Sequence, residues 1–199
     1  MKIKTADPFS GGKKHKTNFG YVYSSGGIPC RINHGTVTHK IHWDKSPECN
    51  FNISFKYVIA LDYDPLLINC FEGLLETDHP YCFVANRALL ELLQAPGATE
   101  KTLPIIQKLI MPLRSAFLSS DNVIWERALE ALRLLAEVTG AGLVSHLHII
   151  LAQLNKRMTL NKKIRENVMG VLNIIEEKGG KEALDLIRSK IPTYTSISM

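Results

Sequence analysis

The sequence predicts an all-α protein, an α-solenoid of about three helix-pair repeats that carries an extended N-terminal arm. Three observations lead to this prediction. From about residue 64 onward, apolar residues recur with the helical period of 3.6 residues. Many of these positions recur again at an offset of forty residues. The first fifty residues lack the helical period and are instead rich in glycine, lysine, serine, threonine and histidine.

The arm is predicted to cover residues 1–60, ahead of a helical-repeat domain at residues 61–199. Two short segments within it have β-strand character, residues 21–23 and residues 35–43. In the second segment, the alternate positions that would share one face of a strand are Val37, His39, Ile41 and Trp43. We therefore expect an extended arm with a short hairpin, lying on the helical body.

Chain-breaking and capping residues delimit the expected helices. Asp64 supplies an N-cap and Pro65 a proline at the first helical position, whereas Pro80 opens a second helix that Pro96 and Gly97 end. Further helices are expected at about 102–118, 121–139, 141–157, 162–178 and 180–190. Their expected terminal residues are Ser120 or Asp121 as an N-cap, and Gly140 and Gly179 as C′ glycines.

The offset of forty residues indicates an internal repeat. The sequence Arg-Ala-Leu at residues 87–89 recurs at residues 127–129, and Leu92 recurs as Leu132 and Leu172. The corresponding units are residues 64–94, 103–139 and 141–178, with residues 180–190 as a cap. A period near forty built from two helices is typical of HEAT and armadillo repeats. Such solenoids form long curved surfaces, which bind proteins far more often than they catalyse reactions.

Positive charge is concentrated at the N-terminus. The chain has a formal net charge of +5, yet residues 1–45 hold eight lysines and arginines against two acidic residues, a net +6. The remaining residues sum to −1. Such an arm is attracted to polyanionic surfaces, whether nucleic acid, anionic lipid or an acidic protein. The alternative is a solvated tail without a partner, because lysines often serve solubility alone.

Two groups of residues are candidates for binding a partner. A second basic cluster surrounds the loop between the helices predicted at 141–157 and 162–178, and the alternative is a solvated helix end. Trp43 is expected to anchor the arm, either onto the body or onto a partner. The candidate binding residues are Lys13, Lys14, Lys16, Arg31 and Trp43 in the arm, and Lys156, Arg157, Lys162, Lys163 and Arg165 at the loop.

The sequence contains few signals for metal binding, catalysis, disulfide bonds, membrane insertion or nucleic-acid binding. No standard zinc spacing is formed by Cys30, His34, His39, His42 and Cys49, so we expect no metal. No phosphate-binding or catalytic motif occurs, so we expect neither an enzyme nor a cofactor. Without a CxxC pair, the cysteines are expected to be free thiols in a reducing cytoplasm. No apolar run is long enough to span a membrane, and few aromatic residues could stack on bases, so we expect neither membrane nor nucleic acid as a partner.

Short motifs occur together in the arm, in the first helix pair and at the C-terminal end. They are Tyr-Ser-Ser-Gly-Gly-Ile-Pro-Cys-Arg at residues 23–31, His34-Gly35, residues 39–43, Gly-Leu-Leu-Glu at residues 73–76, His79-Pro80-Tyr81, Gly179-Gly180, and Ile-Pro-Thr-Tyr at residues 191–194. Taken together they resemble the parkin co-regulated gene product family, and most closely its parkin co-regulated-like branch. The resemblance covers about residues 19–48 and 62–197, and residues 49–60 are extra relative to the family pattern.

The resemblance implies a microtubule-associated protein of the axoneme of cilia or flagella. Members of the family resemble short HEAT or armadillo solenoids with an extended N-terminal arm. In the better-studied branch they bind tubulin at the inner junction of doublet microtubules, beside a small β-rich partner. The resemblance assigns no catalytic residue. The competing expectation is a general helical-repeat adaptor without a cytoskeletal target.

Overall fold

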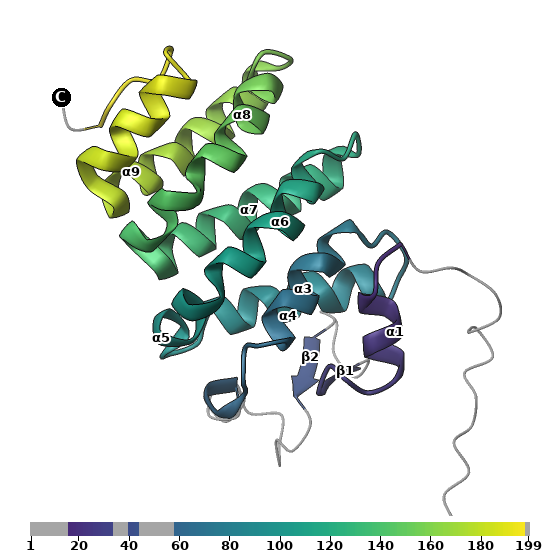
Figure 1. Cartoon of the computed structure of the whole chain (residues 1–199). Coiled ribbons are helices and arrows are strands. Elements are labelled where there is room, and N and C mark those ends of the chain that lie inside the picture. The colour runs from purple at the N-terminus through teal and green to yellow at the C-terminus, as the bar shows by residue number, and fades with distance from the viewer. Residues whose placement is uncertain (1–15, 34–39, 44–57, 198–199) are drawn as a thin grey trace, which may run out of the picture.

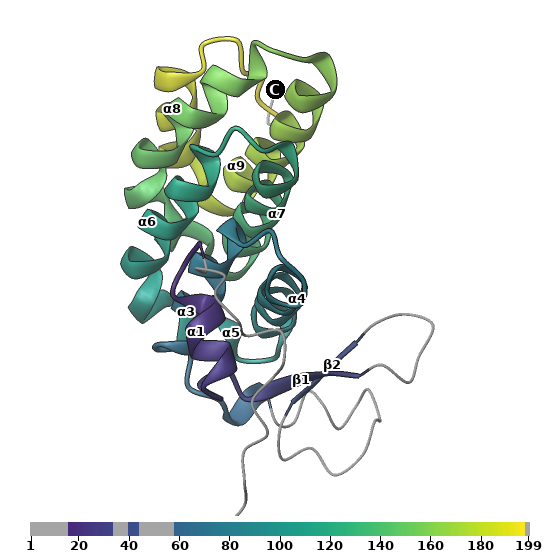
Figure 2. The same ribbon diagram turned by 90° about the vertical axis from the view of Figure 1, so that its right-hand side faces the viewer.

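The computed structural model describes residues 16–33, 40–43 and 58–197, and most of these residues are helical, as predicted. Two layers of helices make up the body (Figures 1 and 2). One layer consists of α3 (Leu66–Glu72), α6 (Ile106–Phe117) and α8 (Leu147–Met158), and the other of α4 (Tyr81–Gln94), α7 (Asn122–Thr139) and α9 (Lys162–Lys190). Consecutive helices pair across the layers, α3 with α4, α6 with α7 and α8 with α9, and each pair packs on the next.

Short helices connect the longer ones. They are η1 (Gly73–Leu75), α5 (Ala98–Thr102), η2 (Leu103–Ile105) and η3 (Gly140–His146). The predicted helix 102–118 is therefore divided into the end of α5, η2 and α6. Pro104 lies at the start of η2, where its ring disfavours continued α-helix in the residue before it.

The positions that recur every forty residues face the core. Leu92, Leu132 and Leu172 lie on three successive helices of one layer, and each has 0% of its surface exposed. Ala88 and Ala128 are buried to the same extent. These recurring residues are thus buried on α4, α7 and α9.

Some expected helix ends are confirmed and others are shifted. Asp121 is the N-cap of α7, because its carboxylate accepts a hydrogen bond from Val123 N at 2.8 Å. Gly140 ends α7 with a φ of 52°. The sequence predicts Gly179 as the C′ glycine of this helix. The break within α9 instead has its positive φ, 65°, at Gly180. At Gly179 a Cβ would lie 2.7 Å from a neighbouring side chain, so this glycine is required for packing.

The start of α3 also differs from the prediction. The N-cap residue is Pro65, and no side chain caps this helix end. The carboxylate of Asp64 instead forms an ion pair with Lys108 Nζ of α6 at 2.5 Å. The expected capping residue thus makes a surface contact between two neighbouring helix pairs.

The N-terminal segment is folded onto the body. Residues 21–23, predicted as β structure, belong to helix α1 (Phe19–Ser24), so this prediction was wrong. A short hairpin is present, with β1 (Cys30–Asn33) paired antiparallel with β2 (Lys40–Trp43) and Cys30 opposite Trp43. Its second strand falls within the predicted segment 35–43, but its first strand was not predicted from the sequence. The described part of the arm is therefore not extended, because its apolar residues are buried against α3 and α4. These residues are Phe19, Ile28, Cys30, Ile41 and Trp43.

Two carboxylates fasten this segment to the helices. Glu76 is 2% exposed, and its Oε1 accepts hydrogen bonds from Thr17 N at 2.9 Å and Thr17 Oγ1 at 2.6 Å. The carbonyl of Glu76 accepts a bond from Arg127 Nη1 of α7 at 3.0 Å. On α4, Glu91 accepts from Trp43 Nε1 and from Arg87 Nε, each at 2.9 Å. Each carboxylate joins the arm to a helix pair.

The segment after the arm enters the body through Tyr63, which is 1% exposed. Its hydroxyl donates a hydrogen bond to the carbonyl of Leu92 on α4. Lys101 Nζ lies 5.2 Å from the centroid of its ring and donates to Leu61 O at 2.6 Å. Residues 49–60 are the segment that is extra relative to the family pattern. Of these, residues 49–57 lie outside the described ranges, and Val58 is buried.

Unfolding at alkaline pH should depend on Tyr63. Burial raises its pKa from 10.0 to about 12, so its neutral form stabilises the fold fully below pH 10, and this contribution is lost as the pH rises toward 12. The Tyr63→Phe variant should lose about 1 kcal/mol at neutral pH with the hydrogen bond, and should show a shallower fall in stability between pH 10 and 12. Urea unfolding across this range measures both effects. Equal slopes would contradict the prediction.

The C-terminal segment returns along α9. Glu176 of α9 is 3% exposed, and its Oε2 accepts from the Tyr194 hydroxyl at 2.6 Å and from Ile197 N at 3.3 Å. The Ser196 hydroxyl donates to the other oxygen of the same carboxylate. Burial, and then the hydrogen bond to Glu176, raise the pKa of Tyr194 above its ordinary value. The C-terminal motif at residues 191–194 thus fastens the chain end to the last helix.

One apolar segment meets the length and hydropathy of a membrane helix. Within Asn122–Met158, an 18-residue window has a mean hydropathy of 1.5, and half of this window is buried in the body. The segment consists of α7, η3 and α8, which pack against α6 and α9. Since buried core helices pass the same test, the segment is weak evidence for a membrane span.

Candidate partner-binding surface

The loop between α6 and α7 and the loop between α8 and α9 lie side by side at one edge of the body (Figure 1). Arg157, near the end of α8, joins them. Its Nη1 donates to Ser119 O at 3.0 Å and its Nη2 to Asn122 Oδ1 at 2.5 Å. Its guanidinium also lies 5.3 Å from the ring centroid of Trp125. We call residues 118–123 together with residues 156–165 the loop edge.

Arg157 is therefore a structural residue. The sequence assigned it to a binding patch, but its guanidinium is occupied by Ser119, Asn122 and Trp125. It holds the two loops of the loop edge in place.

The other predicted cations of the loop edge are exposed. Lys156 lies near the end of α8, and Lys162, Lys163 and Arg165 lie in the first turn of α9, which contains no acidic residue. Within the described residues, the closest carboxylate to any of them is that of Glu166, 3.9 Å from Lys162 Nζ. The N-terminus of a helix carries partial positive charge and favours anions, so three cations at this position oppose the local electrostatic preference.

Apolar side chains are exposed beside these cations. Leu160 is 73% exposed, more than any other large apolar residue of the described chain, and Leu118 and Val123 on the adjacent loop are more than half exposed. The loop edge therefore combines positive charge with exposed apolar surface. Cations at a helix N-terminus, where anions are favoured, together with exposed apolar side chains are typical of a surface used for binding.

The candidate residues of the arm lie elsewhere. Lys13 and Lys14 fall outside the described residues. Lys16 is exposed and precedes the fastened Thr17, and Arg31 lies exposed on β1, opposite His42. The hairpin packs at the end of the body occupied by α3 and α4, away from α8 and α9 (Figures 1 and 2). The structure does not bring the described arm cations to the loop edge.

Trp43 anchors the arm onto the body. It is 1% exposed, and its indole N–H donates to Glu91 at 2.9 Å. Of the two roles left open by the sequence, contact with the body is the one observed. Its assignment as a partner-binding residue is therefore wrong, because no surface of the ring is available.

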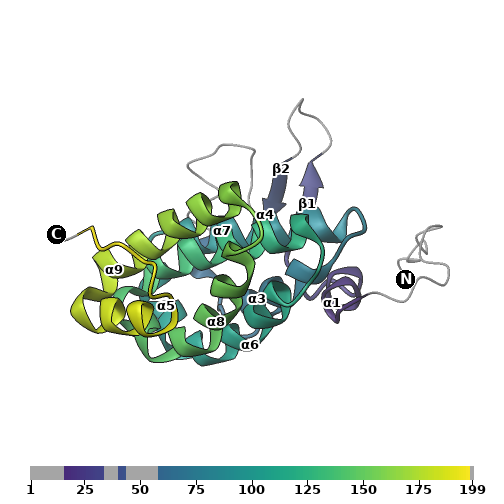
Figure 3. The same ribbon diagram turned by 90° about the horizontal axis from the view of Figure 1, so that it is seen from above.

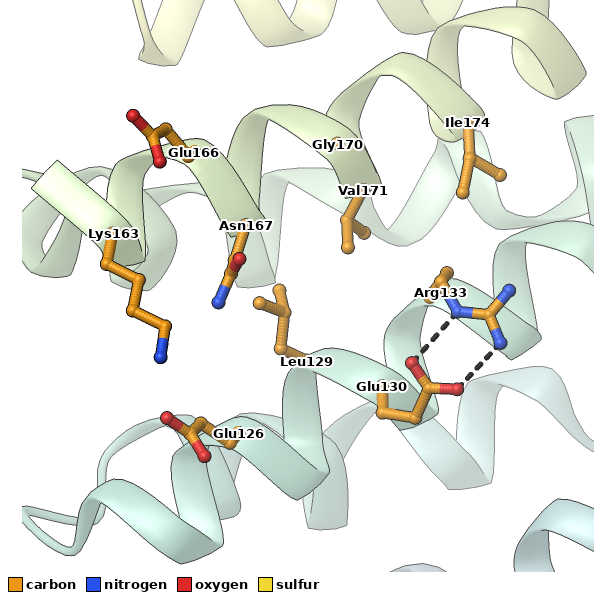
Figure 4. A pocket seen from close by; sticks show the side chains of 10 residues that line it. All are labelled: Glu126, Leu129, Glu130, Arg133, Lys163, Glu166, Asn167, Gly170, Val171 and Ile174. Atoms are coloured by element: carbon orange, nitrogen blue, oxygen red, sulfur yellow. Dashed lines mark hydrogen bonds and ion pairs between the residues drawn. The ribbon is translucent and has the colours of Figure 1, made fainter.

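Helices α7 and α9 pack against each other (Figure 3). A groove between them, whose lining residues Figure 4 shows, was not foreseen from the sequence. It has a volume of about 550 Å³, and its walls carry charged side chains above an apolar floor. Arg133 holds Glu130 by two hydrogen bonds, Nε to Oε2 at 2.9 Å and Nη2 to Oε1 at 2.6 Å, and these bonds lower the pKa of Glu130. A third bond joins Arg133 Nη1 to Glu137 at 2.5 Å. The residues that line the groove recur at intervals of three and four residues along α7 and α9. The sequence alone does not show which helices are neighbours, so it could not predict the groove.

The cysteine and histidine cluster is only partly described. His34, His39 and Cys49 lie outside the described residues. Cys30 is buried near Cys70, and burial, followed by the charge of Cys30, raises the pKa of the Cys70 thiol. Among residues 16–33, 40–43 and 58–197, no three histidine, cysteine or acidic side chains are placed to hold a metal ion.

Comparison with known proteins identifies relatives over nearly the whole chain. The model of the family described as "Parkin co-regulated protein" matches residues 17–196. A Parkin coregulated gene protein homolog from Mus musculus is 30% identical over 197 residues, an alignment that covers 90% of this chain and 76% of the mouse protein. The matched range begins at the fastened Thr17 and ends at Ser196, which bonds to Glu176.

Proposed function

The chain belongs to the Parkin co-regulated protein family, and from this premise we propose that it is a non-enzymatic, microtubule-associated scaffold in the axoneme of cilia or flagella. Its partners are tubulin and axonemal proteins, among them a small β-rich protein of the inner junction. The body acts as a HEAT- or armadillo-like solenoid whose surface binds these proteins. Burial of Leu92, Leu132 and Leu172 at equivalent places supports the repeat, as does the packing of each helix pair on the next.

The basic loop edge is the observation that carries this proposal. Tubulin is strongly acidic, above all in its C-terminal tails, so an exposed cluster of cations is complementary to it in charge. Lys156, Lys162, Lys163 and Arg165 form such a cluster, with Leu160 as an apolar contact in its middle. The lysines of residues 1–15 would add steering at long range.

Reversing charge at the start of α9 should separate binding from stability. The Lys162→Glu/Lys163→Glu variant should pellet less with microtubules than the unchanged chain, and the gap should widen at low ionic strength, where exposed charges are screened least. The same variant should be at least as stable, because acidic residues are favoured at a helix N-terminus. Co-sedimentation and thermal unfolding measure the two effects.

A matched control places the same charge change elsewhere on α9. The Lys178→Glu/Lys181→Glu variant lies far from the loop edge and should pellet like the unchanged chain. A chain without residues 1–15 tests the arm, and the deletion ends before residue 16 because Thr17 and Phe19 are part of the fold. If all these proteins pellet equally, the loop edge and the arm have no role in binding.

The second candidate is a helical-repeat adaptor without a cytoskeletal target, which the layered helices alone would also suit. A tagged chain in a ciliated cell distinguishes the two. Accumulation along the axoneme supports the microtubule scaffold, and a diffuse signal that ignores cilia and microtubules supports the adaptor.

A further inference from the structure

Thr17 joins the arm to the body just before α1. Its backbone N–H and its hydroxyl both donate to Oε1 of Glu76, at 2.9 Å and 2.6 Å, and its Oγ1 accepts from Phe19 N at 3.2 Å. Glu76 is 2% exposed, whereas Thr17 is half-buried and lines a surface pocket of about 380 Å³. The hydroxyl of one threonine at the surface thus links α1 to a buried carboxylate.

The sequence before Thr17 is basic. Residues 13–16 are Lys-Lys-His-Lys, so lysines stand one, three and four positions before the threonine. Protein kinases select their substrates by the pattern of charge around the hydroxyl, and basophilic kinases select lysine or arginine on this side of it. Residues 16–18 belong to neither a helix nor a strand. A kinase therefore has to displace the bonds between Thr17 and Glu76, but no helix or strand, to reach the hydroxyl.

A phosphate on Thr17 would oppose the contact with Glu76. It carries a charge of about −1.5 to −2 at pH 7, and the ester oxygen has no proton to donate. The hydrogen bond of 2.6 Å to a carboxylate would therefore be replaced by repulsion between like charges. Lys16 is exposed and Arg127 binds the carbonyl of Glu76, so neither of these cations is paired with the carboxylate. Glu72, in the lining of the same pocket, adds a further negative charge.

We propose that Thr17 is a phosphorylation site for a basophilic protein kinase, and that its phosphate releases α1 from the body. In the transfer, the bond between the γ-phosphorus of ATP and the leaving ADP breaks as a bond to Thr17 Oγ1 forms, and the hydroxyl proton passes to a carboxylate of the kinase. The kinase acts while the contact between Thr17 and Glu76 is open, and the phosphate then prevents the contact from closing.

The release has a defined structural consequence. Helix α1 lies against α3 and α4 (Figures 1 and 2), with Phe19 fully buried on Gly73 and Ala85. Phosphorylation would uncover this apolar contact and loosen the arm. The proposal does not rest on microtubule binding, because both of its steps are measured on the purified chain alone.

Kinase reactions on the full chain test the first step. The probes are cyclic-AMP-dependent protein kinase and protein kinase C, which select basic substrates, compared with casein kinase 2, which selects acidic ones. Mass spectrometry of proteolytic fragments should find phosphate on Thr17 only with the basophilic kinases. The Lys13→Gln/Lys14→Gln variant should be modified at Thr17 about tenfold more slowly. The Lys178→Gln/Lys181→Gln variant removes the same charge from α9 and should be modified there at the unchanged rate.

Hydrogen exchange tests the release of α1. In the chain phosphorylated at Thr17, residues 19–24 should exchange at least about tenfold faster than in the unmodified chain, with α9 unchanged. Thr17→Val removes the hydroxyl without adding charge and should have a smaller effect. Glu76→Gln makes the acceptor neutral, so phosphate should add less to exchange in this variant. Ser25→Glu places a charge at the exposed end of the same helix and should leave exchange unchanged.

Three results would overturn the proposal. If neither basophilic kinase modifies Thr17, or if the Lys13→Gln/Lys14→Gln variant reacts at the unchanged rate, the basic run does not direct a kinase to this threonine. Unchanged exchange after phosphorylation would show that other contacts hold α1 in place. Equal exchange in the phosphorylated chain and in Thr17→Val would attribute the release to the lost hydrogen bond and not to repulsion. None of these results bears on co-sedimentation of the unmodified chain with microtubules.

Discussion

Glu176→Ala is expected to lower the free energy of unfolding by roughly 2–4 kcal/mol, the largest effect of any single change considered for this protein. The substitution removes the buried carboxylate that accepts hydrogen bonds from the hydroxyls of Tyr194 and Ser196, and leaves Asn173 Oδ1, at 2.9 Å, as the acceptor for Tyr194. It also removes the group that holds the C-terminal segment against α9. Urea unfolding measures the loss of stability, and hydrogen exchange over residues 191–197 should show faster opening of that segment.

The adjacent residue provides the control. Glu177 is exposed and pairs only with its neighbour Lys178 at the surface, at 2.9 Å. Exposed ion pairs contribute little, so Glu177→Ala should change stability by less than about 0.5 kcal/mol. If Glu176→Ala and Glu177→Ala unfold alike, the buried carboxylate does not fasten the chain end.

Gly73→Ala is expected to destabilise the protein by about 1–3 kcal/mol through overpacking. The added Cβ would lie 2.5 Å from Ala85 Cβ and 2.8 Å from Phe19 Cγ, which is closer than real carbon contacts allow. Since Phe19 belongs to α1, relief of the clash should displace this helix. We expect a lower melting temperature together with faster hydrogen exchange in residues 19–24.

Gly170→Ala makes the same change at another helical glycine and should have the opposite sign. Its Cβ meets nothing, and the gain in helix propensity should stabilise α9 by roughly 0.5–1 kcal/mol. A shift of both variants in the same direction would mean that contacts around Gly73 are more yielding than the structure indicates.

Glu176→Ala and Gly73→Ala both disturb contacts made by motifs that carry the family resemblance. Gly73 opens the Gly-Leu-Leu-Glu motif, whose last residue, Glu76, fastens Thr17. Tyr194 ends the Ile-Pro-Thr-Tyr motif and bonds to Glu176. Trp43, in a third motif, bonds to Glu91. These motifs hold the described part of the arm and the C-terminal segment onto the helical body, whereas the exposed cations of the loop edge lie outside them.

Local patterns in the sequence were sufficient to predict most of the helices. Apolar spacing located most of them, the offset of forty residues identified Leu92, Leu132 and Leu172 as equivalent core positions, and Asp121 was recognised as an N-cap. Exposure of lysines at a helix start was also predictable. Each of these features depends on residues within a few turns of one another, and so it can be inferred before the chain folds.

Tertiary structure decided the rest. Residues 19–24 became a helix although residues 21–23 have β-strand character, and Arg157 joined two loops. Trp43 turned inward to Glu91, a choice between body and partner that the sequence left open. The partners in these contacts are 35 to 59 residues apart, as with Arg157 and Asn122 or Thr17 and Glu76. The groove likewise exists only because α7 and α9 are neighbours. Such pairings depend on which surfaces meet when the layers form, and local periodicity contains no information about that choice.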